Sequence, residues 1–473
     1  MQLFNSLSQQ VEELVPVHAG KVGMYSCGPT VYSNLHIGNL SAFIYADILR
    51  RVVRLSGYDV RHVMNITDVD DKTIRDSKAK YPNEEPVQAL KKLTDTYTDV
   101  FKNDITAVGV DIAAIEFVSA VSAIPDMIKL IQQILDAKVG YVAEGGIYFS
   151  VSRYTELGHA YGRLQKIDMT QSMSRIAHDE YDKDQASDFA LWKEVTPGEP
   201  AWEAQFTVDG QVITMSGRPG WHIECSAMSQ MLGVPFDIHT GGIDLKFPHH
   251  ENEIAQSVAA GATDLAMLFV HNNHILVDGR KMSKSLGNIT TLREVEEKGY
   301  EPMAFRLLVL ESQYRNESNF SWAILEAAAN RLKKWQAWAD VRYQTYSELE
   351  HPMQSIEIES YKQAYILALQ DDLSTPQALV EIHSGLEQAM LRGVDKNAKS
   401  HYDDFLKAIK DGIGIDLMQS EDIPVEAQKL LQERQAARDA KDWDKSDKLR
   451  DTLAERGIKV LDDPVRGQIW QRL

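Results

Sequence analysis

The pattern of apolar and polar positions over the first 120 residues predicts alternating strands and helices. Residues 21–26 form a buried apolar run that stops at Cys27, and residues 42–53 carry apolar side chains at helical spacing. Residues 58–66 then alternate as a second strand. This order is typical of a doubly wound parallel sheet, whose ligands lie beyond the carboxyl ends of the strands. We therefore predict an α/β, Rossmann-like fold here.

Residues 116–215 interrupt this alternation. A helix is expected over 125–138 and a β-like segment over 140–151, and a loop-rich polar stretch then runs through 197–200. The strand and helix pattern resumes afterwards, so the segment is interpreted as an insertion into one domain.

The resumed pattern supplies further strands to the same sheet. Residues 236–239 predict a strand, and a helix follows from Pro248, where proline suits the first turn. Residues 268–276 predict another strand, which leads into a loop over 279–288.

Beyond about residue 325 the strand pattern disappears. Segments such as 327–341 and 360–370 are rich in Ala, Leu, Lys, Glu and Gln, which predicts a helical bundle. After a break near Pro424, the tail predicts one more helix pair and a short turn and strand at 457–460. The expected division is a catalytic domain (1–115 and 216–290), a connective insertion (116–215), a linking region (291–325), a helical bundle (326–420) and a small C-terminal domain (421–473).

Composition limits the class of protein. With 473 residues, 44% of them hydrophobic and 25% charged, the chain suits a soluble globular protein of several domains. No apolar run approaches the length of a membrane span and no secretory signal is evident, so we expect a cytoplasmic protein. The formal net charge of -19 disfavours non-specific nucleic-acid binding. Residues 428–473 carry eleven Lys and Arg against nine Asp and Glu, which is a weak local basic bias.

The tetrapeptide His36-Ile37-Gly38-Asn39 lies between a predicted strand and a predicted helix. Backbone N–H groups and the helix dipole can face a phosphate there, and Gly38 admits close approach of a nucleotide. Taken alone, a string with one glycine also arises by chance, so a purely structural His36 stays an alternative.

A second motif, Lys281-Met282-Ser283-Lys284-Ser285, occupies the predicted loop after the next strand. Its two lysines and two hydroxyls suit the charge that develops on a departing pyrophosphate, although a solvated basic loop would look similar. Both motifs follow strands of one predicted sheet, so together they predict an ATP site with Lys281 and Lys284 as its cations.

The only two cysteines, Cys27 and Cys225, suggest a metal site when combined with His249 and Glu253. On a helix from Pro248, His249 and Glu253 project from one face, so both can reach one ion. Thiolate, imidazole and carboxylate are ligands that zinc accepts. The alternative is that the cysteines are buried apolar residues and the histidines belong to a helix surface.

Family resemblance joins these features. The two loop motifs resemble the HIGH-type and KMSKS signatures of class I aminoacyl-tRNA synthetases, with Asn39 where the family often has histidine. Residues 23–30, 220–225, 248–253, 65–72 and the tail segment around Lys441-Asp442-Trp443 are similar to those of cysteinyl-tRNA synthetases. The resemblance spans nearly the whole chain and implies that Cys27, Cys225, His249 and Glu253 bind one zinc ion. His250 is then a neighbour, and His222, His239, His271 and His274 are nucleotide contacts or core groups.

The same resemblance implies roles for the remaining site residues. L-cysteine would lie among Gly28, Thr30, Thr67 and Trp221. ATP, with Mg²⁺, would be bound by Gly38, Gly242, Asp244 and Lys284. His36, Asn39, Lys281 and Lys284 would stabilise the transition state as the cysteine carboxylate attacks the α-phosphate.

The implied acceptor is the 3′ end of tRNA(Cys), bound by a monomer. Residues 291–325 would contact the tRNA stem, and residues 326–420 and 421–473 its anticodon end. Zinc binds a thiolate strongly and a hydroxyl poorly, so it could select cysteine over serine without an editing site. Three alternatives stay open: a cysteine ligase acting on an amino sugar, resembling mycothiol-pathway enzymes; a catalytically silent RNA-binding relative; and a zinc ion that only holds the fold.

Overall fold

The computed structural model describes residues 1–166, 188–282, 287–346, 349 and 351–472. The chain divides into two compact units, Met1–Pro302 with Tyr314–Phe320 and Met303–Gln313 with Ser321–Leu473. Lys284 of the predicted ATP motif lies outside the described residues.

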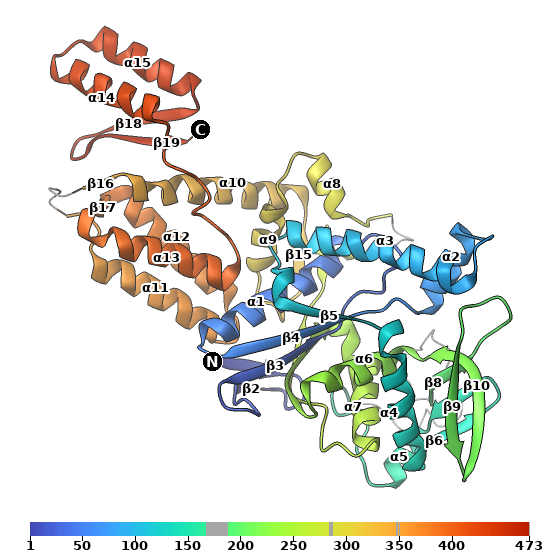
Figure 1. Ribbon diagram of the computed structural model, residues 1–473. Helices are drawn as coiled ribbons and strands as arrows, with labels where there is room; N and C mark the ends of the chain where they lie inside the picture. The colour runs from blue at the N-terminus through green and yellow to red at the C-terminus, as the bar shows by residue number, and fades with distance from the viewer. Residues whose placement is uncertain (167–187, 283–286, 347–348, 350, 473) are drawn as a thin grey trace. The chain divides into compact units, whose positions relative to one another are not determined.

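A five-stranded sheet forms the centre of the first unit, and all of its strands are parallel (Figure 1). Its order is β12 (Ala266–Asn272), β11 (Phe236–Gly242), β3 (Lys21–Ser26), β4 (Asp59–Ile66) and β5 (Ile115–Ser119). The chain builds outward from β3 through β4 to β5 and later returns to add β11 and β12 on the other side of β3. The predicted doubly wound α/β fold is confirmed, and its switch point lies between β3 and β11.

Helix α1 (Ile37–Leu55) begins at the predicted HIGH-type motif because His36 caps it. The Nδ1 atom of His36 accepts the backbone N–H of Asn39 at 3.2 Å. The helix buries apolar side chains such as Leu40 and Ile44 and contacts β3, β4 and β11. Further helices of this unit are α2 (Asp71–Lys80), α3 (Pro86–Ala107), α6 (Trp221–Ser229) and α7 (Glu251–Ala259), of which α6 contacts β4.

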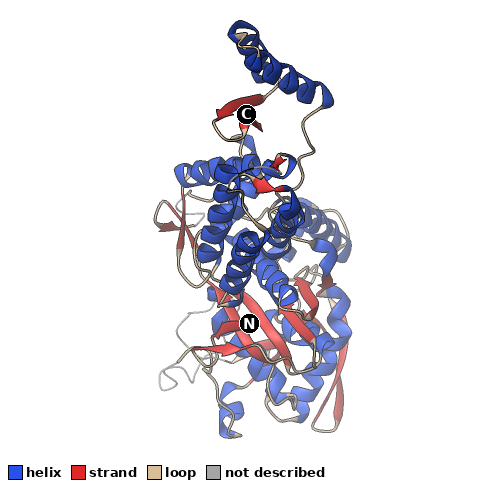
Figure 2. Cartoon of the chain, turned by 90° about the vertical axis from the view of Figure 1, so that its left-hand side faces the viewer, coloured by secondary structure: helices blue, strands red, loops and turns tan. Residues whose placement is uncertain are grey.

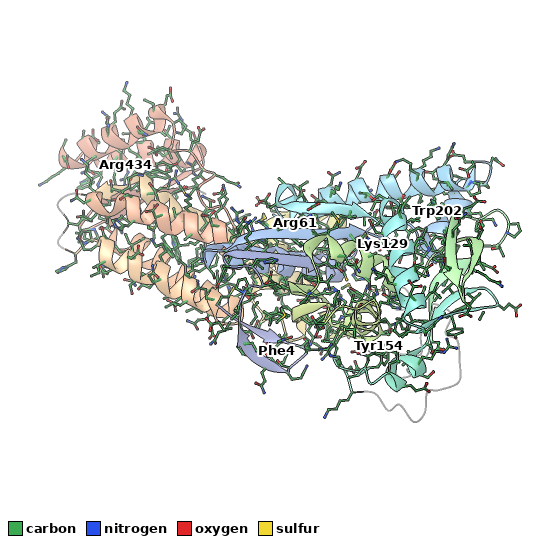
Figure 3. All side chains as sticks on the ribbon, turned by 60° about the horizontal axis from the view of Figure 1, so that its bottom comes forward. Phe4, Arg61, Lys129, Tyr154, Trp202 and Arg434 are labelled. Atoms are coloured by element: carbon green, nitrogen blue, oxygen red, sulfur yellow. The ribbon has the colours of Figure 1, made fainter. Side chains whose placement is uncertain are left out.

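The inserted segment carries a second, antiparallel sheet that the sequence pattern only partly predicted. Its order is β6 (Gly140–Ala143), β7 (Gly146–Phe149), β8 (Phe189–Glu194), β10 (Gln211–Pro219) and β9 (Trp202–Val208). Helices α4 (Ile124–Asp136) and α5 (Val151–Glu156) belong to the same region, where Lys129, Tyr154 and Trp202 mark α4, α5 and β9 in Figure 3. The expectation of a loop-rich stretch was therefore incomplete, because the β9–β10 hairpin is largely polar and gives a weak apolar signal.

One local expectation was wrong. The strand predicted over 268–276 is two strands, since β12 ends at Asn272 and β13 (Ile275–Val277) pairs instead with β14 (Arg280–Lys281) and β15 (Ser318–Phe320). The helix expected from Pro248 is confirmed, because the backbone is extended at Phe247 and helical from Pro248 into α7. The remaining elements of this unit are the hairpin β1 (Gln2–Asn5) and β2 (Gln10–Glu13) and helix α8 (Leu292–Glu297).

The second unit is mostly helical, as Figure 2 shows by colour. Its main helices are α9 (Pro302–Leu310), α10 (Trp322–Ala339), α11 (Ser355–Gln370), α12 (Thr375–Arg392), α13 (Lys399–Ile413), α14 (Val425–Asp439) and α15 (Trp443–Glu455). The two-residue strands β16 (Thr345–Tyr346) and β17 (Val394–Asp395) pair with each other. The tail closes with a hairpin, β18 (Ile458–Asp463) and β19 (Gly467–Arg472), of which only the first strand was expected.

The tail has a core of its own. Ile423, Leu453 and Trp470 pack together in it. Arg434 of α14, labelled in Figure 3, is buried and binds Asp462 of β18 through two hydrogen bonds of 2.8 and 3.1 Å. No helix among the described residues is long and apolar enough to cross a membrane.

Candidate active site

A cleft of about 730 Å³ opens at the carboxyl ends of the central strands, next to the switch point. It brings together most of the residues predicted from the sequence: Cys27, Gly28, Thr30, His36, Gly38, Asn39, Trp221, Gly242, Asp244 and Lys281. The backbone N–H of Cys27 donates to the carbonyl of Thr240 at 3.2 Å, which joins the ends of β3 and β11 beside the cleft. Thr67, Cys225, His249 and Glu253 do not line the cleft and are buried.

The four predicted zinc ligands lie together. Their ligand atoms, from Cys27, Cys225, His249 and Glu253, are all within 4.8 Å of one another. The two sulfurs are 3.9 Å apart, and Nε2 of His249 is 3.0 Å from Oε1 of Glu253. Both thiols are free. Cys27 follows β3, Cys225 lies on α6, and His249 and Glu253 come from the turn and helix at α7.

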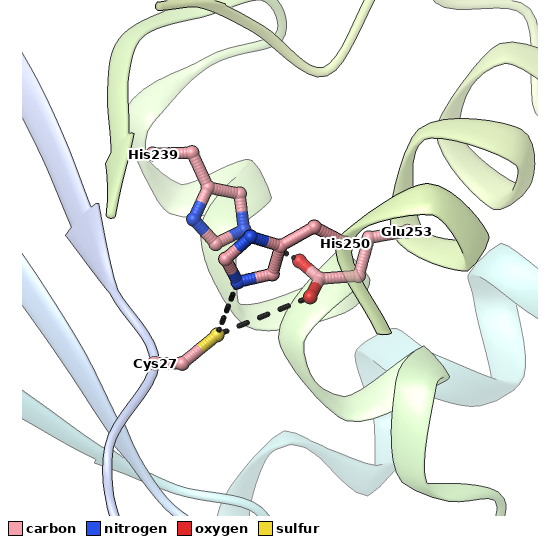
Figure 4. Close-up of side chains that lie close together, drawn as sticks. All are labelled: Cys27, His239, His250 and Glu253. Carbon is pink, nitrogen blue, oxygen red and sulfur yellow. Dashed lines mark hydrogen bonds and ion pairs between the residues drawn. The ribbon is translucent and has the colours of Figure 1, made fainter. Parts of the chain in front are cut away.

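A second donor set shares two members with the first. Cys27, His239, His250 and Glu253 also meet the same distance condition, and Figure 4 shows these four side chains converging. Nε2 of His250 is 3.3 Å from the Cys27 sulfur, and Nε2 of His239 is 2.7 Å from Oε2 of Glu253. The sequence interpretation gave neither histidine a place in the donor set. In the sequence, His239 is marked only by its place at the end of the strand predicted over 236–239, and His250 only by its place next to His249.

Histidine pairs fix the orientation of this cluster. Nδ1 of His249 is 2.8 Å from Nδ1 of His222, so its Nε2 is the nitrogen turned toward Glu253. His250 contacts His271 at 2.8 Å, and His271 in turn contacts Ser6. Burial lowers the pKa of His222, His249 and His271 to about 3, so these rings are neutral near pH 7. A neutral imidazole is the form that binds a metal.

The two thiols and the carboxyl group of Glu253 lie close together and are shielded from solvent. Burial is the main cause that raises the pKa of the Cys27 thiol, and the nearby Cys225 and Glu253 raise it further. Among the described residues, the ion-pair partners of Glu253 are His239 and His249. Two thiols and a carboxyl group gathered in this way fit a divalent cation that accepts sulfur, nitrogen and oxygen donors.

Next to the cluster, a hydrogen-bonded network holds the turn after β3. The amide of Asn65 accepts the backbone N–H of Gly28 at 2.7 Å and donates to the hydroxyl of Thr67 at 3.0 Å. That hydroxyl donates to the buried carboxyl of Glu224 at 3.1 Å. A Cβ atom at residue 28 would lie 1.7 Å from the carbonyl oxygen of Asn65, so only glycine fits. The sequence interpretation did not include Asn65 or Glu224.

Trp221 lines the cleft and contacts the cluster through His249. Its ring centroid is 4.2 Å from that of His249. The indole therefore forms a wall between the cleft and the buried histidines.

The nucleotide motifs lie on the more exposed part of the cleft. A Cβ atom at residue 38 would be 2.5 Å from the methyl carbon of Met282, so Gly38 permits close approach of the second motif. Nζ of Lys281 is 3.5 Å from Nε2 of His274, and both line the cleft. Burial lowers the pKa of His36. Because its Nδ1 accepts a hydrogen bond, the neutral ring carries its proton on Nε2, which can donate.

Two family models match this chain. Residues 13–330 match the family model for the class I (C) tRNA synthetase catalytic domain, and residues 420–470 match that for the cysteinyl-tRNA ligase anticodon binding domain. The chain is 36% identical to the cysteine–tRNA ligase of Chlamydia muridarum, over 97% of each chain. It is 37% identical to that of Leptospira interrogans, over 100% of this chain and 99% of the relative.

Solved structures show the same fold at lower identity. A methionyl-tRNA synthetase of Mycobacterium tuberculosis, in complex with methionyl-adenylate, aligns with a TM-score of 0.57 and 15% identity, over 84% of this chain and 91% of that one. The matched family models, the relatives and the site geometry agree: this chain belongs to the cysteine–tRNA ligases, enzymes of the class I aminoacyl-tRNA synthetase family.

Proposed function

We propose that this chain activates L-cysteine with ATP and transfers it to the 3′ end of tRNA(Cys), and that a zinc ion selects the amino acid. The observation that carries the proposal is the cluster of Cys27, which lines the cleft, with the buried Cys225, His249 and Glu253. Zinc held by these four residues would supply a thiophilic centre that favours a substrate thiolate over the hydroxyl of serine.

The protein's own residues position the amino acid. Trp221 forms an apolar wall, and the turn at Gly28 and Thr30 is fastened to Thr67, whose backbone N–H donates to the carbonyl of Pro29 at 3.0 Å. Glu224 and Asn65 orient the Thr67 hydroxyl, so the small pocket keeps its shape before cysteine enters.

The nucleotide end holds ATP and stabilises charge. Nε2–H of His36 and the ammonium of Lys281 face the cleft, where they can bind oxygens of the phosphates, with Mg²⁺ as counter-ion. Gly242 and Asp244 line the cleft after β11, where Asp244 can accept hydrogen bonds from the ribose. Lys284 and Asn39 complete the proposed set. The cysteine carboxylate attacks the α-phosphate and pyrophosphate leaves, which forms cysteinyl adenylate. A ribose hydroxyl of the tRNA then attacks the acyl carbon, and AMP leaves as the acyl–phosphate bond breaks.

The tail supports tRNA as the acceptor rather than an amino sugar. Residues 420–470 match an anticodon binding domain, and such a domain has no task in a ligase for small sugars. We further propose a monomer in the cytoplasm, with residues 291–325 at the tRNA stem and 326–473 at the anticodon end.

The experiment measures cysteine-dependent ATP–pyrophosphate exchange and then the charging of tRNA, in the wild-type chain and in Cys225→Ser. The variant is expected to lose zinc, and its preference for cysteine over serine should fall to about 10²-fold or less, the level that shape alone provides. Ser229→Ala, on the same helix α6 but outside both donor sets, is the packing control.

Each alternative has its own outcome. Unchanged selectivity in a zinc-free Cys225→Ser protein contradicts the zinc mechanism. A zinc-depleted enzyme that unfolds, while its folded fraction keeps its selectivity, indicates a metal that only holds the fold. Exchange without tRNA charging points to another acceptor, and absence of exchange points to a silent relative.

A further inference from the structure

One wall of the cleft is used by neither cysteine nor ATP in the mechanism above. It consists of Tyr32, Phe43, Lys72 and Tyr97, which we call the aromatic wall. Tyr32 comes from the loop after β3, and the others from α1, α2 and α3 respectively. The elements that carry the two ATP motifs contribute only Phe43, so the wall is built largely from a separate part of the catalytic unit.

The wall presents aromatic surface that is held in place. Phe43 packs edge to face on Phe101 at a centroid distance of 5.0 Å, and both are buried. Tyr97 precedes Phe101 by one turn of α3 and therefore lies on the same helix face. Tyr32 and Tyr97 are only half-buried and line the cleft, so part of each ring is accessible from it. Rings of this kind are platforms on which nucleobases stack.

A cation stands beside these rings. The ammonium of Lys72 is 5.6 Å from the ring centroid of Tyr32, and within the described ranges it forms no ion pair with a carboxylate. On the same helices, Arg75 is paired with Asp76 at 2.7 Å and Lys91 with Asp95 at 2.5 Å, and Lys72 is the one cation of α2 and α3 that lines the cleft. In a chain of formal net charge -19, an exposed lysine that lines a cleft and has no carboxylate partner among the described residues is suited to an anion.

We propose that the aromatic wall binds the single-stranded 3′-terminal nucleotides of the acceptor RNA. Bases stack on Tyr97 and Tyr32, and Lys72 pairs with a backbone phosphate. This inference rests on the proposed function, because the acyl group is transferred in this cleft and the RNA end must enter it. Stacking with one phosphate contact is tolerant of sequence, so the wall would position the RNA end and leave its identity to be read elsewhere.

The test separates the two half-reactions in the full-length chain. Lys72→Ala and Tyr97→Ala are each measured for cysteine-dependent ATP–pyrophosphate exchange and for charging of a tRNA transcript. We expect kcat/KM for tRNA to fall about tenfold in each variant, while KM for ATP and for cysteine in exchange changes by less than about twofold. The slope of log KM for tRNA against log salt should become shallower by about 0.7 in Lys72→Ala, which lacks one phosphate contact.

Conservative variants distinguish binding from structure. Tyr97→Phe keeps the stacking surface and Lys72→Arg keeps the charge, so both should retain charging near the wild-type level. Lys78→Ala removes an exposed cation from the same helix α2 at a residue that does not line the cleft, and should leave charging unchanged.

Three results would overturn the inference. A parallel loss of exchange and charging would assign the wall to ATP or cysteine. An equal loss in Lys78→Ala would show a diffuse charge effect, and unchanged charging in both alanine variants would show that RNA does not use the wall. These results differ from failure of the proposed function, in which the wild-type chain itself lacks cysteine-dependent exchange or charges no tRNA.

Discussion

The two ends of the cleft are built in opposite ways. At the cysteine end, Cys225, His249 and Glu253 are at most 1% exposed and lie within a network of mutual contacts. At the nucleotide end, Lys281 and Asn39 are exposed. A buried arrangement fixes its donors before the substrate arrives, whereas exposed side chains can adjust to a ligand. We therefore expect changes at the cysteine end to alter stability and cysteine binding together, and changes to the exposed side chains of the nucleotide end to alter catalysis alone.

The largest effect is expected for Lys281→Ala. Its ammonium lines the cleft where charge develops on the leaving pyrophosphate, so kcat for ATP–pyrophosphate exchange should fall by about 10²–10³. The side chain is exposed, and its one described polar contact is His274 at 3.5 Å, so the melting temperature should stay the same. Exchange kinetics and a thermal melt measure the two quantities. Arg280→Ala, an exposed neighbour that does not line the cleft, is the control. A large fall in melting temperature would contradict the expectation that Lys281 contributes to catalysis and not to stability.

A second prediction concerns pH and the buried side. His62 lies under the cysteine end, where its Nε2 is 2.8 Å from the hydroxyl of Ser26, and burial lowers its pKa to about 3. The unfolded ring has a pKa near 6.5, so above that pH both states are neutral and the group has no effect. Below that pH the unfolded state is protonated at this ring while the folded state stays neutral. This difference lowers the free energy of unfolding by about 2 kcal/mol between pH 7 and pH 5.

Replacing the titrating ring tests this. His62→Gln keeps a side chain that can hydrogen-bond to Ser26 but cannot titrate. Between pH 7 and pH 5 the free energy of unfolding of the variant should therefore fall by about 2 kcal/mol less than that of the wild type. Urea unfolding across this pH range measures the difference. His18→Gln, at an exposed position, should keep the wild-type slope. Equal slopes in wild type and His62→Gln would mean that the buried histidine is not the cause.

Thr67→Val should affect stability and substrate binding together. The change removes a hydroxyl that joins Asn65 to Glu224 and leaves a buried carboxyl group without its partner. An unsatisfied buried polar group costs about 1–3 kcal/mol, and loosening of the turn at Gly28 should raise KM for cysteine about tenfold. Thr67→Ser keeps the hydroxyl and should restore both. If KM for cysteine rises with no loss of stability, the pocket is less pre-organised than the network suggests.

Sequence reasoning located the parts of the cleft that are formed by contiguous residues. The loop motifs at His36 and Lys281 could be located because a strand end and a helix start are local patterns, and the parallel sheet then brings the two loops to one edge. Cys27 and Cys225 could be paired because they are the only cysteines. These predictions needed only the order of elements along the chain.

The partners of those residues could not be predicted in the same way. His239 reaches Glu253, and Glu224 reaches Thr67, only through the register of the sheet and the packing of α6 and α7. No local pattern fixes such contacts across long sequence separations. The β9–β10 hairpin was missed for a related reason, since its strands are stabilised by cross-strand pairing rather than by an apolar face of their own.

The smallest effect is expected at Asn39, where the family often has histidine. The structure shows its backbone N–H bonded to Nδ1 of His36, and this contact does not depend on the side chain. The amide itself is exposed, so in Asn39→Ala exchange loses at most one hydrogen bond to ATP, which is worth about 0.5–1.5 kcal/mol or roughly tenfold at most in kcat/KM.

His36→Ala provides the contrast within the same motif, because it removes both the cap of α1 and a donor to the cleft. Exchange kinetics of the two variants, each with a thermal melt, measure the difference. A fall of more than a hundredfold in kcat/KM for Asn39→Ala would contradict this expectation. It would show that catalysis depends on the exposed Asn39 side chain as strongly as on the buried residues.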